Sequence, residues 1–437
     1  MRLLHLFTAL IVLYILTGCS VSKQIAKQAN SILLKDSSIS TGHIGICIYE
    51  PATNKYWYTY NDTHYFIPAS NTKLFTLYAG MKYLGDSLPA AKILEYADEI
   101  CMTATGDPTL LNSEYSFQPL YNFLVATSKY IQMIPSAWQA DHLGKGWAWD
   151  DYSSDYMAER SALPVYGNLV TFNGKKDFIQ FYPKVSKIEK ITINSPDTGH
   201  DFISKVQRRI DQNVFDITLG ASRPNKIQIP FRTSELLSFA LLSDTIKKPI
   251  GFFKDAFTNP VKIFTLHSQP TDSLFKPMMH RSDNFFAEQT LLMASNEHLG
   301  YMNDEKIIDT ILNTDLKDVP QRPKWVDGSG LSRYNLFTPK SLVYILNKMK
   351  IEFGLERMKV ILPTGGEGTL SSYYKKDAGF IYAKTGTLSN NCAVSGYLVT
   401  NKGKLLIFSV LANNYITGAT PIRRAAERFL QGIREKY

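Results

Sequence analysis

The stretch Pro68-Ala69-Ser70-Asn71-Thr72-Lys73-Leu74-Phe75 decides how the rest of the chain is interpreted, because it places Ser70 and Lys73 three positions apart. Residues at this spacing are neighbours on a helix surface, so the Lys73 amine can reach the Ser70 hydroxyl, and a helix beginning here points the positive end of its dipole at Ser70. A serine is a weak nucleophile unless a nearby base accepts its proton. On its own, the pattern more often marks an exposed capping serine beside a solvated lysine, so the other motifs have to decide.

Bulk composition bounds the class of protein. The 437 residues exceed a typical single core and predict two or three domains, and 44% hydrophobic with 20% charged residues is the balance of a folded protein. The net charge of +9 comes from lysines and arginines scattered among carboxylates, without a basic stripe. We therefore expect no nucleic-acid partner, and infer only a mild attraction to an anionic surface or polymer.

The first nineteen residues resemble a secretion signal. Arg2 precedes an apolar run over residues 3–16, which is too short to span a membrane comfortably. The run ends in Leu16-Thr17-Gly18-Cys19, which is similar to the lipobox of bacterial lipoproteins, so we predict a signal peptide over residues 1–18 and lipidation of Cys19. A non-lipidated signal peptide is the alternative. Ser20 stands where an inner-membrane retention signal has Asp, which favours outer-membrane attachment facing the periplasm.

Three further cysteines, Cys47, Cys101 and Cys392, are far apart in the sequence. An odd number of widely spaced cysteines does not suggest a disulfide framework, so we expect buried free thiols.

Alternation and helical periodicity outline the architecture. Apolar residues recur at helical spacing after Lys73, as far as Leu84, and predict a helix with one buried face. Strands are predicted near both ends of the chain, and helices at both ends and in the second half. The strands are 43–50, 56–60, 381–387, 393–400 and 405–411, and the further helices are 21–34, 284–296, 304–312, 339–350 and 421–434. This pattern predicts one antiparallel sheet assembled from both ends, beside a helical half.

Two later motifs change the interpretation of Ser70. Ser282-Asp283-Asn284 precedes a predicted helix, and Lys384-Thr385-Gly386-Thr387 lies on a predicted strand. Separately, the first is explained as a helix cap and the second as a polar strand end. In this order, however, Ser-x-x-Lys, Ser-x-Asn and Lys-Thr-Gly are the signature set of penicillin-recognising serine acyl-transferases.

The segments between these motifs make the resemblance specific. Ser282 lies 212 positions after Ser70, a much longer gap than in class A β-lactamases. The chain also carries the runs Gly106-Asp107-Pro108-Thr109-Leu110, Gly146-Trp147-Ala148-Trp149-Asp150-Asp151 and Asp327-Gly328-Ser329-Gly330-Leu331-Ser332-Arg333-Tyr334-Asn335. From about residue 44 to 428 it resembles the D-alanyl-D-alanine carboxypeptidase/endopeptidase family, the class C low-molecular-mass penicillin-binding proteins of the penicillin-binding protein 4 type. Arg281 departs from the Lys that family members often carry before Ser-x-Asn, but keeps the charge.

The resemblance implies an α/β (α+β) fold of the penicillin-binding transpeptidase/β-lactamase type, an antiparallel sheet plus a helical half. Residues 19–92 and 270–437 would form the catalytic domain, and residues 93–269 one or two inserted, mostly β domains. No metal-ligand spacing or phosphate-binding loop is present in the sequence, so neither a metal nor a cofactor is indicated.

The family's site residues transfer to matching positions. Ser70 would attack the carbonyl of the penultimate D-alanine, and Lys73, held partly neutral by burial and by the charge of Lys384, would take its proton. Ser282 would relay a proton to the leaving amine, and Asn284 would bind the substrate amide. The terminal carboxylate would be held by Lys384, Thr385 and Thr387, and the backbone N–H groups of Ser70 and Thr387 would form the oxyanion hole.

Asp150 and Arg333 have opposite charges in two loops. They could bind the amine and carboxylate of a zwitterionic stem side chain such as that of meso-diaminopimelate, although mobile surface residues are a nearly equal alternative. Trp147 and Trp149 could form pocket walls, but packing is at least as good an explanation.

The motif set predicts a periplasmic, lipid-anchored serine D,D-peptidase that removes terminal D-alanine from peptidoglycan stem peptides, cleaves D-Ala crosslinks, or does both. β-Lactam antibiotics would be covalent inhibitors, and the oligomeric state is left open. One alternative is a β-lactamase, although the Glu-x-x-Leu-Asn loop of class A enzymes is absent. The other is a non-catalytic envelope-binding lipoprotein, which would not need all five of Ser70, Lys73, Ser282, Asn284 and Lys384.

Overall fold

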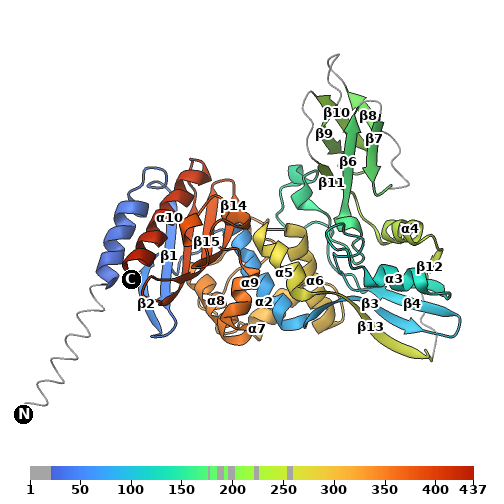
Figure 1. Ribbon diagram of the computed structural model, residues 1–437, viewed down its shortest axis with the longest axis horizontal. Coiled ribbons are helices and arrows are strands. Elements are labelled where there is room, and N and C mark those ends of the chain that lie inside the picture. The colour runs from blue at the N-terminus through green and yellow to red at the C-terminus, as the bar shows by residue number, and fades with distance from the viewer. Residues whose placement is uncertain (1–20, 176–177, 185–190, 195–201, 221–225, 253–258) are drawn as a thin grey trace, which may run out of the picture.

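The computed structural model describes residues 21–175, 178–184, 191–194, 202–220, 226–252 and 259–437. The predicted signal peptide and Cys19 lie outside the described residues. Figure 1 shows an elongated molecule in which the sheet built from the chain ends lies at one end, the helices in the middle, and two further sheets at the other end.

The first sheet joins the two ends of the chain, as predicted. Its five antiparallel strands run in the order β14-β15-β16-β1-β2. The strands are β1 (His43–Glu50), β2 (Lys55–Tyr60), β14 (Ile381–Leu388), β15 (Asn391–Val399) and β16 (Leu405–Asn413). β14 is an edge strand, and no strand among the described residues pairs with the other side of its Lys-Thr-Gly-Thr run, which could therefore pair with a peptide.

Helices cover both faces of this sheet. The helical run from residue 21, which ends in the π-helix η1 (Asn30–Leu34), packs with α10 (Ala419–Lys436) over one face (Figure 1). The helical half covers the other face. It consists of α2 (Lys73–Tyr83), α5 (Thr271–His280), α6 (Asn284–Leu299), α7 (Asp304–Asn313), α8 (Pro339–Phe353) and α9 (Leu355–Ile361). The predicted helices are thus confirmed, each within a few residues.

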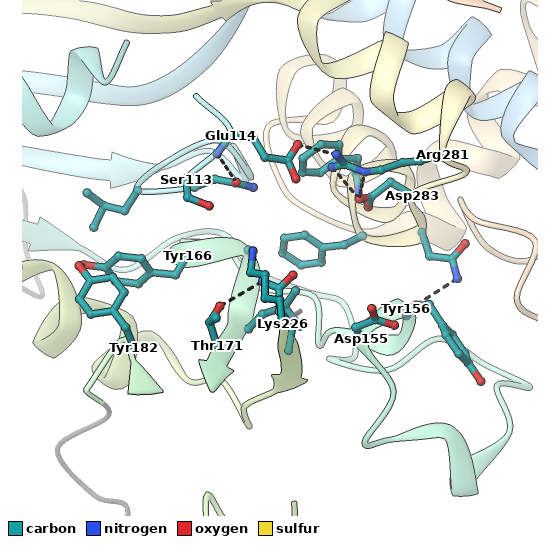
Figure 2. Close-up of a pocket in the computed structure, with 18 of the residues that line it drawn as sticks. Ser113, Glu114, Asp155, Tyr156, Tyr166, Thr171, Tyr182, Lys226, Arg281 and Asp283 are labelled. Atoms are coloured by element: carbon teal, nitrogen blue, oxygen red, sulfur yellow. Dashed lines mark hydrogen bonds and ion pairs between the residues drawn. The ribbon is translucent and has the colours of Figure 1, made fainter. Parts of the chain in front are cut away.

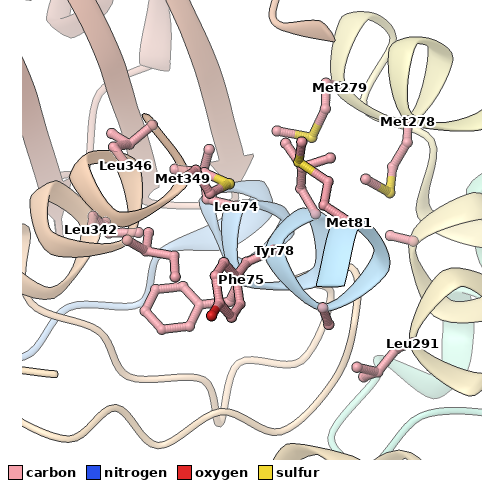
Figure 3. Close-up of a cluster of buried hydrophobic side chains, with 14 of the residues drawn as sticks. Leu74, Phe75, Tyr78, Met81, Met278, Met279, Leu291, Leu342, Leu346 and Met349 are labelled. Carbon is pink, nitrogen blue, oxygen red and sulfur yellow. The ribbon is translucent and has the colours of Figure 1, made fainter. Parts of the chain in front are cut away.

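Helix α2 is the centre of the helical half. Every residue from Lys73 to Met81 is buried, so the helix has no solvent-facing side before its last turn, whereas the sequence suggested only one apolar face. Figure 3 shows its side chains between those of α8, such as Leu342, and those of α5 and α6, such as Met278 and Leu291. A helix packed on all sides fixes the position of the residues at its beginning.

The inserted region carries two sheets. The nearer one has the order β12-β5-β4-β3-β13, and the farther one has the order β11-β6-β9-β10-β8 with β7 paired to β6. The nearer sheet contains β3 (Ser87–Glu95), β4 (Glu99–Ala104), β5 (Tyr130–Ile134), β12 (Ile250–Phe252) and β13 (Lys262–Pro270), with α3 (Pro119–Ala126) and α4 (Glu235–Ile246) beside it. The farther sheet contains β6 (Leu169–Lys175), β7 (Phe178–Tyr182), β8 (Ile191–Asn194), β9 (Phe202–Arg208), β10 (Phe215–Gly220) and β11 (Ile227–Pro230).

The antiparallel pair β3 and β13 connects the helical half to these sheets, because β3 follows α2 and β13 precedes α5 in the chain. β3 already begins at Ser87, ahead of the predicted insertion, and the domain limits 93 and 269 stay predictions. The three cysteines among the described residues, Cys47, Cys101 and Cys392, are buried free thiols, as expected. None of the helices within the described ranges is long and apolar enough to cross a membrane.

Candidate active site

Ser70 lies in a short 3-10 turn, η2 (Ala69–Thr72), that leads directly into α2. The Lys73 Nζ donates a hydrogen bond to the Ser70 Oγ over 3.0 Å, so the predicted contact is present. Ala69, immediately before the serine, has a φ of 48°, a left-handed conformation that a residue with a side chain rarely adopts. Such strain is retained where the surrounding structure fixes the backbone, and it often marks a functional site.

Side chains of the first sheet hold η2 in place. The Asn71 amide donates to the Ser395 hydroxyl on β15 (2.8 Å), and the Asn413 amide on β16 makes both hydrogen bonds with the backbone of Ile67, at 2.7 and 3.1 Å. Gly386 lets β14 approach, because a Cβ there would lie only 2.6 Å from the Pro68 carbonyl oxygen and 2.9 Å from the Ser70 nitrogen. The glycine of Lys-Thr-Gly is therefore required for contact between the strand and the serine turn.

Three acceptors surround the Lys73 amine. Besides Ser70, the Nζ donates to the Asn284 Oδ1 and to the Ser329 carbonyl, both at 2.7 Å. Asn284 begins α6, and its Nδ2 in turn donates to the Tyr156 carbonyl (3.0 Å). Asn284 thus orients the lysine and is fixed by the inserted region at the same time.

Burial lowers the pKa of Lys73 to about 8, although the carboxylates of Asp327, Glu288 and Asp283 favour its charged form. Desolvation penalises an ammonium more strongly than these carboxylates support it here. Burial, followed by the charges of Lys73 and Arg423, also holds the pKa of Lys384 well below its usual value. The sequence analysis expected the charge of Lys384 to contribute to lowering the pKa of Lys73. In the structure, the repulsion between the two amines lowers the pKa of Lys384 instead.

Ser282 and Lys384 form a second serine–lysine pair. The Lys384 Nζ donates to the Ser282 Oγ at 2.8 Å and to the Thr385 carbonyl at 2.6 Å. Ser282 has a φ of 66°, so it is, after Ala69, the second strained non-glycine residue near Ser70. The structure therefore joins the Ser-x-Asn motif both to Lys73, through Asn284, and to the Lys-Thr-Gly strand, through Ser282.

Ser70 opens into a pocket of about 450 Å³, which we call the reactive pocket. Its lining includes Ser282, Asn284 and Thr387 of the motifs, together with Arg333. Arg333 reaches it from the glycine-rich loop, where its Nη1 donates to the Ser389 carbonyl at 3.2 Å. Thr387 also accepts a hydrogen bond from Arg423 of α10.

Some predicted site residues lie elsewhere. Asp150 does not line the reactive pocket, whereas its neighbour Asp151 does, because both belong to a short 3-10 turn in which consecutive side chains diverge. Thr385 borders a small apolar cavity between the sheet and α10 rather than the reactive pocket. Tyr156 lines the reactive pocket and was not found from the sequence, because no motif marks it.

Residues 25–432 match the profile of the D-Ala-D-Ala carboxypeptidase 3 (S13) family. The chain belongs to this family. The match confirms the predicted serine-type D-Ala-D-Ala peptidase of peptidoglycan and the predicted family, and it favours this activity over the β-lactamase and non-catalytic alternatives.

Several relatives of this S13 chain are known. It is 33% identical to carboxypeptidase DacB of Mycolicibacterium smegmatis over 174 residues, 37% of each chain. It is 23% identical to D-alanyl-D-alanine carboxypeptidase DacB of Haemophilus influenzae over 86% of this chain and 87% of that protein. The crystal structure of penicillin binding protein 4 (dacB) from H. influenzae has a TM-score of 0.73 at 18% identity, covering 94% of this chain and 99% of that chain. The structural match confirms the predicted fold.

The glycine-rich loop of the S13 chain, residues 327–335, packs against the turn that carries Ser70. Gly330 has a φ of 81°, and a Cβ there would lie 1.9 Å from the Ala69 carbonyl oxygen, so the loop packs directly on the serine turn. The Asp327 carboxylate holds the loop, accepting from the backbone of Gly330 (2.8 Å) and Ser332 (2.6 Å). Its Oδ2 also accepts from the Trp147 indole at 2.9 Å, so Trp147 packs as a link to the inserted region, while Trp149 is exposed.

A buried ionic cluster continues beneath this loop. Glu288 on α6 accepts from the Ser329 N–H at 2.7 Å and contacts Arg160, whose Nη1 also pairs with Asp304 at 2.6 Å. Burial and the neighbouring Asp327 raise the pKa of Glu288. Ser329 is the residue whose carbonyl binds Lys73, so this cluster positions an acceptor of the Lys73 amine. The sequence analysis missed it, although Glu288 is a charged residue in an otherwise apolar stretch of helix.

We expect Arg160→Met to lower the free energy of unfolding by about 3–5 kcal/mol, because it leaves the buried Glu288 and Asp304 carboxylates without their partner. Lys145→Met is the matched control. It breaks the exposed Lys145–Glu305 pair, whose side chains are 72% and 64% accessible, and we expect a loss below about 1 kcal/mol. Urea unfolding followed by tryptophan fluorescence measures both. Equal losses in the two variants would mean that the buried cluster is not a stabilising element.

Proposed function

We propose that this S13 chain works through an acyl-enzyme formed on Ser70 by attack on the carbonyl of a penultimate D-alanine. The observation that carries the proposal is the buried Lys73 amine, 3.0 Å from the Ser70 Oγ and with a pKa lowered to about 8. An amine with this pKa is neutral in about a tenth of the molecules at pH 7, and in this form it can accept the serine proton as the new bond forms.

The proton then has a defined route to the leaving group. Lys73 takes it from Ser70 as the tetrahedral intermediate forms. Ser282 donates its hydroxyl proton to the departing amine and regains one from Lys384, so that the proton gained by Lys73 balances the proton released by Lys384. The C–N bond breaks, leaving an ester on Ser70, which water hydrolyses to regenerate the hydroxyl. Burial lowers the pKa values of both lysines, which favours their neutral, proton-accepting forms.

The substrate would lie along the free edge of β14. Lys384, Thr385 and Thr387 would bind the terminal carboxylate, and Asn284 the substrate amide. The oxyanion would be stabilised by the backbone N–H groups of Ser70 and Thr387, where one such donor contributes about 3 kcal/mol to lowering the barrier in acyl-transfer enzymes. For Thr385 to bind the carboxylate, its side chain would have to turn toward the reactive pocket, because it borders the cavity beside α10 in the structure.

For the zwitterionic side chain of the stem peptide, we propose Arg333 together with Asp151 in place of Asp150. Arg333 and Asp151 both line the reactive pocket, and their opposite charges suit a side chain that carries an amine and a carboxylate. Peptidoglycan stem peptides would be the substrates, and β-lactams would acylate the same serine.

Digestion of defined muropeptides, followed by mass spectrometry, tests this function. We expect loss of one D-alanine from uncrosslinked pentapeptide stems, cleavage of D-Ala crosslinks, or both. No reaction with either substrate would contradict the proposal. Nitrocefin provides a second test, because a D,D-peptidase gives a stoichiometric burst whereas a β-lactamase turns the compound over steadily.

The rate of acylation should depend on pH through Lys73. The base is active when neutral, so the second-order rate constant for acylation by a fluorescent penicillin should rise about tenfold per pH unit below about pH 8 and level off above it. A lysine of ordinary pKa, 10.5, would give a rise that continues past pH 9. A profile that is flat between about pH 6 and 8 would exclude Lys73 as the base.

We also propose that the protein acts in the periplasm, attached to the outer membrane through a lipid on Cys19. The support is the apolar run that ends in Leu16-Thr17-Gly18-Cys19, followed by Ser20. Incorporation of labelled palmitate by the wild type, and its loss in Cys19→Ser, would test the anchor.

A further inference from the structure

A second, larger hollow begins where the reactive pocket ends. Its volume is about 610 Å³, and it shares Ser282, Asn284 and Tyr156 with the reactive pocket. We call it the stem groove. Ser282 therefore stands at the junction of the two spaces, with its hydroxyl bound to Lys384 at 2.8 Å.

The stem groove is lined by the helical half and by both parts of the inserted region, the loop next to the nearer sheet and the farther sheet. Figure 2 shows Glu114, Arg281 and Asp283 along one side, with Thr171, Lys226 and Tyr182 along the other. The first side comes from the loop after β4 and from the beginning of α6, and the second from β6, β7 and the residue before β11. The inserted region thus forms most of a cavity that opens next to the reactive serine.

Two charged side chains of the stem groove are unpaired. Arg281 is neutralised, because its guanidinium pairs with Glu114 at 2.5 Å and with Asp283 at 3.0 Å. By contrast, within the described ranges, the exposed Lys226 ammonium and Asp155 carboxylate make no hydrogen bond or ion pair. In Figure 2 both lie on the side opposite Arg281. The groove therefore offers one free positive and one free negative group to a ligand.

We propose that the stem groove binds the leaving half of a crosslinked dimer, the second stem peptide beyond the scissile D-Ala bond. This inference rests on the proposed function, which places the departing amine beside Ser282. At about 610 Å³, the stem groove lies within the range of roughly 300–1,000 Å³ that is usual for pockets enclosing drug-sized ligands. It is therefore much larger than a single departing alanine needs. A second stem peptide is large enough, and its free carboxylates match Lys226 in charge.

The proposal makes the inserted region a specificity element for crosslinks. Terminal D-alanine removal would use only the reactive pocket, and crosslink cleavage would use both spaces. Lys226 is expected to act on kcat/KM for the dimer, since it meets only the part of the substrate that a monomeric stem lacks.

The test compares kcat/KM on a crosslinked dimer with kcat/KM on an uncrosslinked pentapeptide stem. We expect Lys226→Glu to lower the dimer-to-monomer ratio about fivefold at low salt, the size of a partly exposed charge pair, and less at high salt. Lys205→Glu, the same charge change on exposed β9 of the same sheet, should leave the ratio unchanged. A ratio that is the same in both variants would overturn the proposal.

A dimer whose free carboxylates are amidated identifies the group that Lys226 recognises. The effect of Lys226→Glu should vanish on this substrate, as a double-mutant cycle requires. If it persists, Lys226 does not bind the stem carboxylates and the proposal is wrong.

Dimers freed of their sugars separate peptide from glycan recognition. We expect them to retain the Lys226 effect, and its disappearance would show that the groove binds the glycan strand instead. Failure of the inference differs from failure of the proposed function. Wild type that releases D-alanine but shows no dependence on Lys226 refutes only the groove, whereas wild type that acts on neither substrate refutes the reaction itself.

Discussion

Replacing Ser70 with alanine is expected to abolish labelling by a fluorescent penicillin and to reduce D-alanine release by at least about 10⁴-fold, as removal of the nucleophile does in other serine hydrolases. The methyl group of the introduced alanine has no oxygen to form the ester. The fold should be unaffected, because Ser70 belongs to a turn held by Asn71, Ile67 and the β14 strand rather than by its own hydroxyl. Gel fluorescence after penicillin labelling and a D-alanine assay measure the two losses.

Two further serine variants make this result decisive. Ser371→Ala changes an exposed serine and should leave labelling at the wild-type level. Ser282→Ala should slow acylation while labelling still occurs, because the proposed mechanism uses Ser282 to relay a proton and not to carry the acyl group. If Ser70→Ala were still labelled and Ser282→Ala were not, the two serines would have the opposite roles.

The sequence predicts the catalytic half of the fold well, because local patterns and long-range pairing agree there. The strand at 43–50 alternates and the strand at 405–411 is a nearly continuous apolar run, and their pairing as β1 and β16 joins the two chain ends. The helix after Ser70 illustrates the limit of periodicity. A helix that is buried on every side has no polar face, so its pattern cannot show that it lies at the centre of the helical half.

The site is predicted best where a motif fixes both residue type and spacing. Lys73 contacts Ser70, and Lys384 contacts Ser282, as the motifs require. Asp151 lines the reactive pocket and Asp150 does not, a difference that depends on the phase of a 3-10 turn, which no motif encodes. Arg160 could not be found, because its function arises from buried contacts with distant residues rather than from its neighbours in the sequence.

The Lys73→Met variant should lose about 10³-fold in the rate of acylation, within the range expected when a general base is removed. Methionine has nearly the length of lysine and no amine, so Ser70 keeps its position but loses the group that accepts its proton. The rise of the acylation rate constant up to about pH 8 should disappear with the same substitution, because that rise reports the titration of Lys73.

Stability distinguishes this loss of chemistry from a loss of folding. Removing a buried amine relieves its desolvation, while the Asn284 Oδ1 and the Ser329 carbonyl each lose a donor, at about 1–3 kcal/mol apiece. These contributions oppose one another, so the free energy of unfolding should change far less than the activity. Lys82→Met, in the exposed last turn of the same helix, should keep full activity, since its pairs with Asp315 and Glu352 are partly exposed, at 3.5 and 3.7 Å. Folded Lys73→Met that acylates at the wild-type rate would assign the base to another group, and the Lys384 amine, whose pKa is also lowered, would be the first to examine.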